Sequence, residues 1–205
     1  MAREAQIAGS QAGAVVVGGG RPELLATRLE AAFDPAAAGV LSFGLCGGLD
    51  PALRPGDLLI ATQIVSEGRV HHADPEWVER LAARIPMARR ATIAGADAFV
   101  VDVASKIALR ADTDAAAVDT ESHIAADLAQ RHGLPFSALR AVSDGADRAL
   151  PRAAQLRLKP DGRPDLGAIL ASLAAEPLQL SALIRVAFEA EAGFRALRRA
   201  WNSVV

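Results

Sequence analysis

Residues 39–63 read GVLSFGLCGGLDPALRPGDLLIATQ, and this stretch decides the fold that we expect. Two runs in it, 39–45 and 57–63, have the length and the near-continuous apolar character of strands buried on both faces. The glycine cluster at 44–48 lies where the first run ends, so a ligand could approach the backbone at the carboxyl edge of a sheet. A crowded turn that only glycine can follow is the alternative.

Similar apolar runs alternate with helical patterns along the chain. Further strands are expected over residues 13–19, 91–101, 115–119 and 135–143, and helices over 22–33, 75–85, 103–110, 121–132 and 166–175. This alternation is typical of an α/β fold with a largely parallel sheet. A helical period over 180–201 predicts a terminal helix that docks its apolar face on the domain, with a membrane-surface or partner helix as the alternative. We expect one domain over residues 1–205.

The composition argues against several classes of protein. The chain has 205 residues, 51% of them apolar, a net charge of −2 and a pI near 6.1, which provides no broad basic surface for nucleic acid. Its single cysteine, Cys46, excludes an internal disulfide and suits a reducing compartment. No uncharged apolar run reaches the roughly 18 residues of a transmembrane helix, and residues 1–13 lack the apolar core of a signal peptide. We expect a cytoplasmic protein.

Three local features have both a functional and a structural interpretation. The Gly-Gly-Gly-Arg turn at 18–21 could bind an anion through its backbone N–H groups and the arginine, or it could be a tight turn without a ligand. Cys46 lies in an apolar turn and is expected to be a small core residue rather than a nucleophile. His71 and His72 are adjacent and would face opposite sides of a strand, so we expect no metal site.

Two segments with carboxylates follow expected strands. Residues 118–123 read VDTESH, and residues 140–147 read RAVSDGAD. Glu121 could accept two hydrogen bonds from a vicinal diol such as that of ribose, or it or Asp119 could cap the helix that follows. Asp144 should emerge at the same edge of the sheet, where two carboxylates could divide the roles of acid and acceptor. A turn aspartate and a structural Arg–Asp pair are the alternative.

Together these features resemble the nucleoside phosphorylase family, which includes purine nucleoside phosphorylases and 5′-methylthioadenosine/S-adenosylhomocysteine nucleosidases. The resemblance covers residues 1–150 and rests on Glu4, GLCGGLDPALRPGDLLIA at 44–61, GADAFV at 95–100, VDTES at 118–122 and RAVSDGAD at 140–147. Residues 42–58 are most similar to the hopanoid-associated branch, which is thought to remove adenine from adenosylhopane. The resemblance implies a three-layer α/β/α fold with a mixed central sheet, and homo-oligomers.

The resemblance also implies roles for the matching residues. The implied catalytic residues are Asp144, Glu4 and Arg140, the substrate-binding residues are Glu121, Thr120, Phe99, Val100 and Ser143, and the phosphate site is Gly18, Gly19, Gly20, Arg21 and Gly47. Asp144 would protonate N7 of the leaving purine, so its carboxyl must hold a proton near neutral pH, a form that burial favours. Glu121 would bind the ribose hydroxyls as the sugar becomes oxocarbenium-like. Glu4 would position an attacking water, with Arg140 near the nucleophile.

Several features depart from the family pattern. Leu45 occupies the place of a serine that touches the nucleophile, and Thr120 replaces a methionine beside the ribose. The first change removes a hydroxyl from the nucleophile site, and the second alters the pocket for the sugar and its 5′ substituent. The family begins with a strand that delivers the Glu4 segment. That strand is expected to be missing here, either because the start is misassigned or because the protein does without it. Residues 150–205 also diverge.

From these residues we expect cleavage of the N-glycosidic bond of a purine nucleoside. The preferred reaction is phosphorolysis of an adenosine with a bulky 5′ group, with phosphate as co-substrate and no cofactor or metal. One alternative is hydrolysis by a methylthioadenosine/adenosylhomocysteine nucleosidase, and another is a nucleoside-binding protein without activity. The expected partners are a purine nucleoside, lipid-linked in the case of adenosylhopane, and further copies of the chain. We expect no nucleic acid and no membrane span.

Overall fold

The computed structural model describes residues 2–9, 13–18, 22–155 and 165–204. Within these residues, the strands form one mixed sheet in the order β3-β2-β4-β5-β1-β6. Their bounds are Val40–Gly48 (β1), Leu58–Ser66 (β2), Arg69–His72 (β3), Arg89–Gly95 (β4), Ala117–Asp119 (β5) and Phe136–Asp144 (β6). β1 is parallel to β6, and β4 is parallel to both β2 and β5, whereas β5 is antiparallel to β1. β2 also pairs antiparallel with both β3 and β6.

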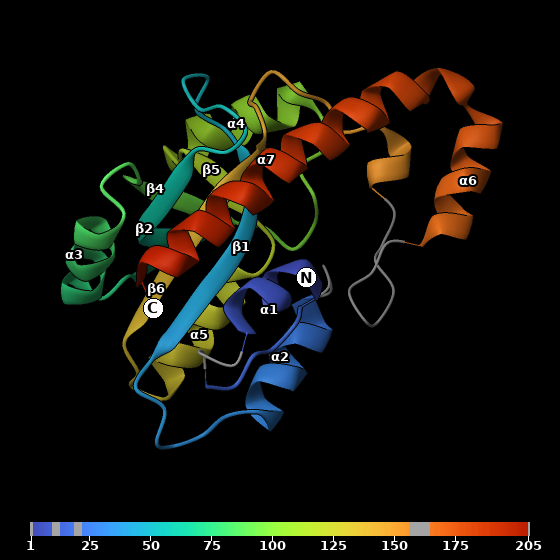
Figure 1. Ribbon diagram of the computed structural model, residues 1–205. Helices are drawn as coiled ribbons and strands as arrows, with labels where there is room; N and C mark the ends of the chain where they lie inside the picture. Colours follow the sequence, from blue (N-terminus) through green and yellow to red (C-terminus); the bar gives the residue numbers. More distant parts are fainter. Residues whose placement is uncertain (1, 10–12, 19–21, 156–164, 205) are drawn as a thin grey trace.

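The helices lie on both sides of this sheet, as the α/β pattern predicts (Figure 1). Their bounds are Ala2–Ala8 (α1), Pro22–Ala31 (α2), Pro75–Arg84 (α3), Val103–Thr113 (α4), Ser122–Arg131 (α5), Leu166–Ala175 (α6) and Leu180–Val204 (α7), with short 3₁₀ turns at Arg152–Ala154 (η2) and Pro177–Gln179 (η3). α3 begins as its sequence indicates, because Oδ1 of Asp74 accepts a hydrogen bond from the backbone N–H of Trp77 at 2.7 Å and Pro75 follows the cap.

The core lies between the sheet and the helices that cover it. In β6 every residue except Ser143 is buried, and the buried ones include the polar residues Ser137, Arg140 and Asp144. The second half of α7 docks on the sheet as expected, and the ring of Trp201 packs on Phe43 of β1 with the centroids 5.2 Å apart. Truncating a fully buried core residue such as Leu139 to alanine would cost about 2–5 kcal/mol.

The N-terminal part of the chain differs from its predicted structure. Residues 13–18 form no strand, although a strand was expected over 13–19, and residues 2–8 form the unpredicted helix α1. β1 pairs with β6 along one edge, and in the described residues only Gly47 and Gly48 pair along its other edge, with β5. The rest of that edge, over residues 40–46, has no partner strand among the described residues, and residues 13–18 do not form a ladder of hydrogen bonds with it.

Two further differences concern β3 and β4. β4 ends at Gly95 instead of reaching residue 101, and residues 96–101 form a bend and loop that lead to Asp102, the cap of α4. β3 was not predicted, but it places the two adjacent histidines as expected for a strand: His71 is buried and bonds to Gln130 at 2.8 Å, whereas His72 is exposed.

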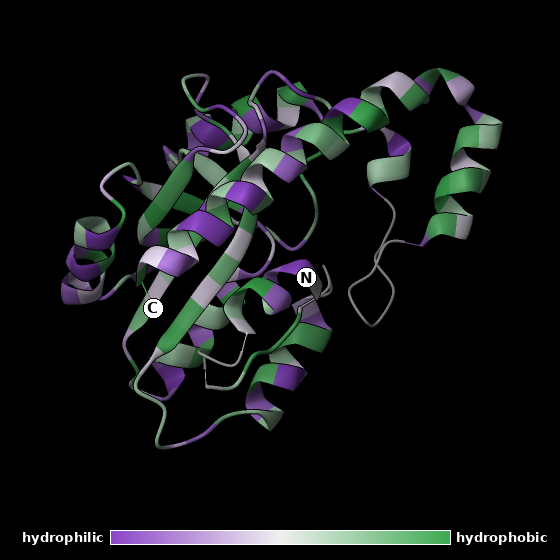
Figure 2. Cartoon of the chain, viewed as in Figure 1, coloured by the Kyte–Doolittle hydropathy of each residue, from purple (hydrophilic) through white to green (hydrophobic). Residues whose placement is uncertain are grey.

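α6, η3 and the first half of α7 project from the rest of the molecule (Figure 1). Hydrophobic residues, green in Figure 2, are frequent on this arm, and the exposed large ones are Leu166, Leu170, Leu178, Leu180, Ile184 and Phe188. Docking of the terminal helix is thus confined to its second half. Among the described residues no single helix has both the length and the apolar character needed to span a membrane. α6 and the η3–α7 segment have that length and character only when taken together, and the chain bends by 118° between them.

Candidate active site

A cavity of about 260 Å³ lies at the carboxyl ends of β1, β5 and β6. Of the residues predicted for the site, those that line this cavity are Glu4, Gly47, Phe99, Val100, Thr120, Glu121, Arg140, Ser143 and Asp144. Gly18 lies beside one of them, Glu121. The other predicted residues, Gly19, Gly20 and Arg21, lie outside the described residues. The fold thus brings together side chains that are widely separated along the chain.

Asp144 is the last residue of β6 and is buried. Its Oδ2 accepts a hydrogen bond from Nζ of Lys106 at 2.5 Å, and its Oδ1 accepts one from Oγ of Ser143 at 2.6 Å. Lys106 also donates to the carbonyl oxygen of Gly145 at 2.8 Å. A Cβ on Gly47 would lie 3.3 Å from Oδ2 of Asp144, so glycine lets β1 pass close to this carboxylate. The expected acid is therefore one half of a buried ion pair.

Arg140 is held inside the protein by a network of hydrogen bonds. Its Nε lies 3.0 Å from Oδ2 of Asp119, and its Nη2 donates to Oγ of Ser42 at 2.5 Å and to Oγ of Ser122 at 2.9 Å. Burial lowers the pKa of Arg140, but the nearby carboxylates of Asp119 and Glu121 raise it, and the net shift is upward. The structural Arg–Asp pair considered from the sequence therefore exists, with Asp119 and not Asp144 as the partner.

Asp119 and Glu121 have different roles at the start of α5. Oδ1 of Asp119 accepts hydrogen bonds from the backbone N–H groups of Glu121 and Ser122, both at 2.7 Å. Glu121 makes no capping bond with its side chain, and it lines the cavity instead. A Cβ on Gly18 would lie 2.4 Å from Oε1 of Glu121, so with glycine at this position the backbone passes close to this carboxylate. The capping alternative thus applies to Asp119, and Glu121 remains available to a ligand.

Glu4 reaches the same cavity from α1. It is 5% exposed, and its Oε1 accepts a hydrogen bond from the backbone N–H of Leu45 at 3.4 Å. A Cβ on Gly44 would lie 3.0 Å from this oxygen and 2.6 Å from Nη1 of Arg140. The carboxylate of Glu4 and the guanidinium of Arg140 therefore converge above one glycine of β1, where an attacking group could be held between an anion and a cation.

The rest of the cavity wall is mostly apolar. Phe99 and Val100 lie in the loop between β4 and α4, and Thr120 lies between β5 and α5. Apolar residues outside the predicted set complete the wall, and those that come from the part of the chain after residue 147 are Leu150, Ala154, Val186 and Ala190. Burial raises the pKa of the Cys46 thiol, which supports a core role for it. No cluster of His, Cys, Asp or Glu in the described part of the chain is arranged to bind a metal ion.

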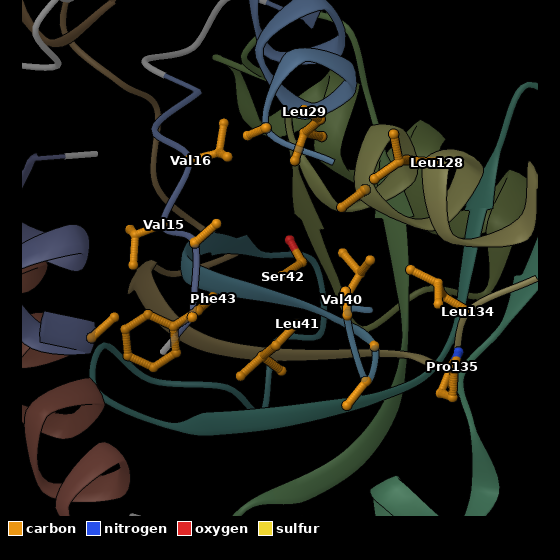
Figure 3. Close-up of a pocket in the computed structure, with 18 of the residues that line it drawn as sticks. Val15, Val16, Leu29, Val40, Leu41, Ser42, Phe43, Leu128, Leu134 and Pro135 are labelled. Atoms are coloured by element: carbon orange, nitrogen blue, oxygen red, sulfur yellow. The ribbon is translucent and has the colours of Figure 1, made fainter. Parts of the chain in front are cut away.

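A second cavity, of about 890 Å³, lies between residues 13–17, α2, β1 and α5. Figure 3 shows its mainly apolar lining, to which Val15, Val16, Leu29, Val40, Leu41, Phe43, Leu128, Leu134 and Pro135 contribute. Glu4 and Glu121 line both cavities, so the two adjoin at these carboxylates. The sequence pattern did not predict this space, because it lies where residues 13–18 fail to form a strand.

Three polar residues that bond to site residues were missed from the sequence, and one of them is Ser122, whose Oγ accepts a hydrogen bond from Arg140. Lys106 occupies an ordinary position of an expected helix, and Ser42 lies inside an apolar strand. The sequence does contain an indication for Lys106: the chain has arginine at all but two of its 22 basic positions, so each lysine stands out as an exception. Ser42 carries no such signal, since its hydroxyl gains a role only where Arg140 of the neighbouring strand reaches it.

A mixed sheet with a carboxylate-lined cavity at the carboxyl ends of its strands is typical of α/β proteins that bind small molecules. Residues 6–175 match the family model described as the phosphorylase superfamily, and the chain belongs to that superfamily. A search of curated protein sequences gave no match.

Solved structures of the same fold include two enzymes of Helicobacter pylori. Native futalosine hydrolase of strain 26695 is 21% identical, with a TM-score of 0.58 over 90% of this chain and 75% of that one. 5′-Methylthioadenosine/S-adenosyl homocysteine nucleosidase is 22% identical, with a TM-score of 0.58 over 87% of this chain and 73% of that one. A mutant of the futalosine hydrolase is 25% identical with a TM-score of 0.52; this match covers 59% of our chain and 64% of the hydrolase, less than two thirds of its length.

Proposed function

We propose that this protein cleaves the N-glycosidic bond of a purine nucleoside and releases adenine. The observation that carries the proposal is the position of two carboxylates: Glu121 follows β5 and Asp144 ends β6, and both line one small cavity. Glu4 and Arg140 line the same cavity. Breaking a glycosidic bond needs an acid for the leaving base, an acceptor for the sugar hydroxyls and a held nucleophile. These side chains can supply all three.

In the proposed reaction, Asp144 protonates N7 of the purine as the bond from C1′ to N9 breaks. Ser143, whose hydroxyl contacts Asp144, helps to hold the base, and Phe99 packs on its ring while Val100 binds it through the backbone. Glu121 accepts hydrogen bonds from the ribose hydroxyls, and these bonds strengthen as positive charge develops on the sugar. General acid catalysis of this kind contributes about 10²–10⁴-fold to the rate.

We propose an adenosine with a large apolar 5′ group as the substrate, such as adenosylhopane in the branch that residues 42–58 resemble. The adjoining cavity of about 890 Å³ supports this choice, because it borders the carboxylates assigned to the sugar and is lined mainly by apolar side chains. The 5′ group would extend from the sugar past Glu121 and be covered by Val15 and Leu41 (Figure 3). Removing that apolar surface from water would favour binding.

The attacking group in the preferred reaction is phosphate. Arg140 supports this choice, because its raised pKa keeps it cationic beside the cavity. The backbone of Gly18 approaches Glu121 closely, at the start of the turn expected to bind the anion. The products would be adenine and a ribose 1-phosphate that retains the 5′ group.

Hydrolysis is the second candidate, and the position of Glu4 favours it. A buried carboxylate beside the nucleophile would repel a phosphate dianion, whereas it could take a proton from an attacking water. The structural neighbours named above are a hydrolase and a nucleosidase. If water attacks, the products would be adenine and a free sugar with its 5′ group.

Adenine release, measured by chromatography with and without phosphate, tests the function. The substrates are 5′-methylthioadenosine and an adenosine with a long 5′-alkylthio group. We expect phosphate-dependent release, faster from the long-chain substrate. Release that is independent of phosphate would favour hydrolysis, and nucleoside binding without release would contradict both enzymatic proposals.

A matched pair of variants tests where the 5′ group lies. Val15→Trp places a bulky side chain at a half-exposed position of the large cavity, whereas Met87→Trp changes an exposed residue outside both cavities. We expect Val15→Trp to lower kcat/KM for the long-chain substrate about tenfold and to leave kcat/KM for methylthioadenosine unchanged. The indole would fill space that the long 5′ group needs, so less of that group's apolar surface would be buried on binding, whereas the short methylthio group does not reach this space. An equal effect on both substrates would contradict this placement.

A further inference from the structure

We propose that Lys106 is a positioning residue that holds the Asp144 carboxylate and supplies the proton that Asp144 passes to the leaving base when the glycosidic bond breaks. Nζ of Lys106 lies 2.5 Å from Oδ2 of Asp144, and both residues are buried. This inference rests on the proposed function, in which Asp144 delivers a proton to the leaving base.

The burial of Lys106 is unusual for its helix. It is the one residue of α4 that is buried, whereas the apolar neighbour Ile107 is 63% exposed. An amphipathic helix normally turns an apolar stripe to the core, and a lysine is almost never fully buried unless it is paired. α4 therefore places an ammonium group, in preference to apolar surface, behind the carboxyl of Asp144.

Two contacts determine where this ammonium group lies. Asp102 caps α4 by accepting hydrogen bonds from the backbone N–H and the Oγ of Ser105, at 2.8 and 2.7 Å. One residue further on, Nζ of Lys106 donates to Asp144 and to the carbonyl oxygen of Gly145. Two of its three N–H donors are thus used on the end of β6 and the residue that follows it. The helix start and the strand end together fix the distance between amine and carboxyl.

Stability alone gives a weak reason to keep such a pair. Replacing a buried ion pair with well-packed apolar residues is often neutral or stabilising, because burying two charges costs about as much as their attraction returns.

The choice of lysine over arginine beside Asp144 points to a role in proton transfer. The chain uses arginine for all but two of its 22 basic residues, yet a lysine faces Asp144. A lysine can give up its proton in a buried site, whereas an arginine cannot.

The proposed step balances as follows. The bond between C1′ and N9 breaks, and its electron pair passes to the purine. The Asp144 carboxylate takes a proton from the Nζ ammonium of Lys106 and passes it to N7 of the purine. Asp144 therefore begins and ends as a carboxylate, and Lys106 is left as a neutral amine that regains a proton from water. The net transfer is one proton from Nζ to N7.

Comparing two leaving groups separates this role from a structural one. Adenine must be protonated to leave, whereas p-nitrophenolate leaves a p-nitrophenyl riboside as a stable anion. For Lys106→Met we expect adenine release from methylthioadenosine to fall at least about 10²-fold, the usual contribution of general acid catalysis. Release of p-nitrophenolate should stay near the wild-type rate. Equal losses on both substrates, or no loss on either, would overturn the proposal.

Lys106→Arg keeps the positive charge but cannot pass on a proton. We expect it to show the same split between the two leaving groups, and normal adenine release by this variant would overturn the proton transfer. If Lys106→Met does not fold, Lys106→Arg decides the question alone. Ile107→Met, on the exposed side of α4, is the control and should match wild type. A wild-type protein that releases no adenine would overturn the proposed function together with this inference, whereas normal adenine release by both Lys106 variants would overturn only the inference.

Discussion

Nε of Arg140 lies 3.0 Å from Oδ2 of Asp119, and both side chains are almost completely buried. This ion pair joins β6 to the end of β5 across β1, the strand that lies between them. Asp119 also caps α5 through two backbone N–H groups. One buried contact therefore holds the strand that carries Asp144 and the helix start that carries Glu121.

Breaking this ion pair from one side should destabilise the protein strongly. Arg140→Met leaves the Asp119 carboxylate buried without its cation, and the loss of a partner in a buried pair costs about 3–5 kcal/mol. We expect a loss of that size in the free energy of unfolding, measured with urea. The double variant Arg140→Met/Asp119→Asn should recover part of the loss, because no uncompensated charge remains. A loss below about 1 kcal/mol in the single variant, the range of an exposed pair, would contradict this account.

Asp144→Asn should separate binding from turnover. The amide can still accept the hydrogen bond from Lys106, but it cannot protonate a leaving base. We expect adenine to bind with little change in calorimetry, while adenine release from the nucleoside falls by about 10²–10⁴-fold. Asp147→Asn is the matched control, since Asp147 lies close by in the sequence and is 79% exposed. Unchanged turnover in Asp144→Asn would contradict the acid role.

Glu4→Gln should distinguish the two possible nucleophiles. The change removes the only charge of that side chain and keeps its shape, so an attacking water loses its base. We expect release without phosphate to fall about 10²-fold and phosphate-dependent release to persist. Glu23→Gln, in the first turn of α2, is the control because it lies outside both cavities. If both kinds of release fall equally, Glu4 acts on something other than water.

The cap of α4 should make stability depend on pH. Hydrogen bonds from the backbone N–H and the hydroxyl of Ser105 hold the pKa of Asp102 below its ordinary value of 3.8. A carboxyl whose pKa is lowered by folding stabilises the folded protein above that ordinary value, and the contribution is lost as the pH falls through the lowered one. Asp102→Asn keeps a good cap without a titrating group.

The free energy of unfolding, measured with urea from about pH 6 down to about pH 3, gives this dependence. Its slope against pH reports how many more protons the unfolded chain binds than the folded one. We expect stability to fall less steeply with acid in Asp102→Asn than in the wild type. Identical pH profiles for the two proteins would contradict a stabilising role for the ionised cap.

Much of the site could be predicted because it consists of strand ends. The apolar runs before Gly47 and Asp144 are local features, and their strands β1 and β6 are parallel, so both carboxyl ends reach one edge of the sheet. Glu121 follows β5, which is antiparallel to β1, so its place at the same cavity depends on the tertiary structure. A strand over 13–19 was predicted wrongly for a related reason. Its apolar residues have the right pattern, but they lie across the large cavity from the free edge of β1 and form no ladder with it, and no local pattern reports such a separation.

The sequence by itself determined the α/β class, the order of the main strands and helices, and the segments that meet at the cavity, because apolar periodicity and chain reversals are properties of neighbouring residues. Only the tertiary structure decided which charges pair. Lys106 and Asp144 are 38 positions apart, and nothing near either residue marks the other as its partner. The cost of burying a charge depends on what lies within a few ångströms of it, and the fold sets those distances.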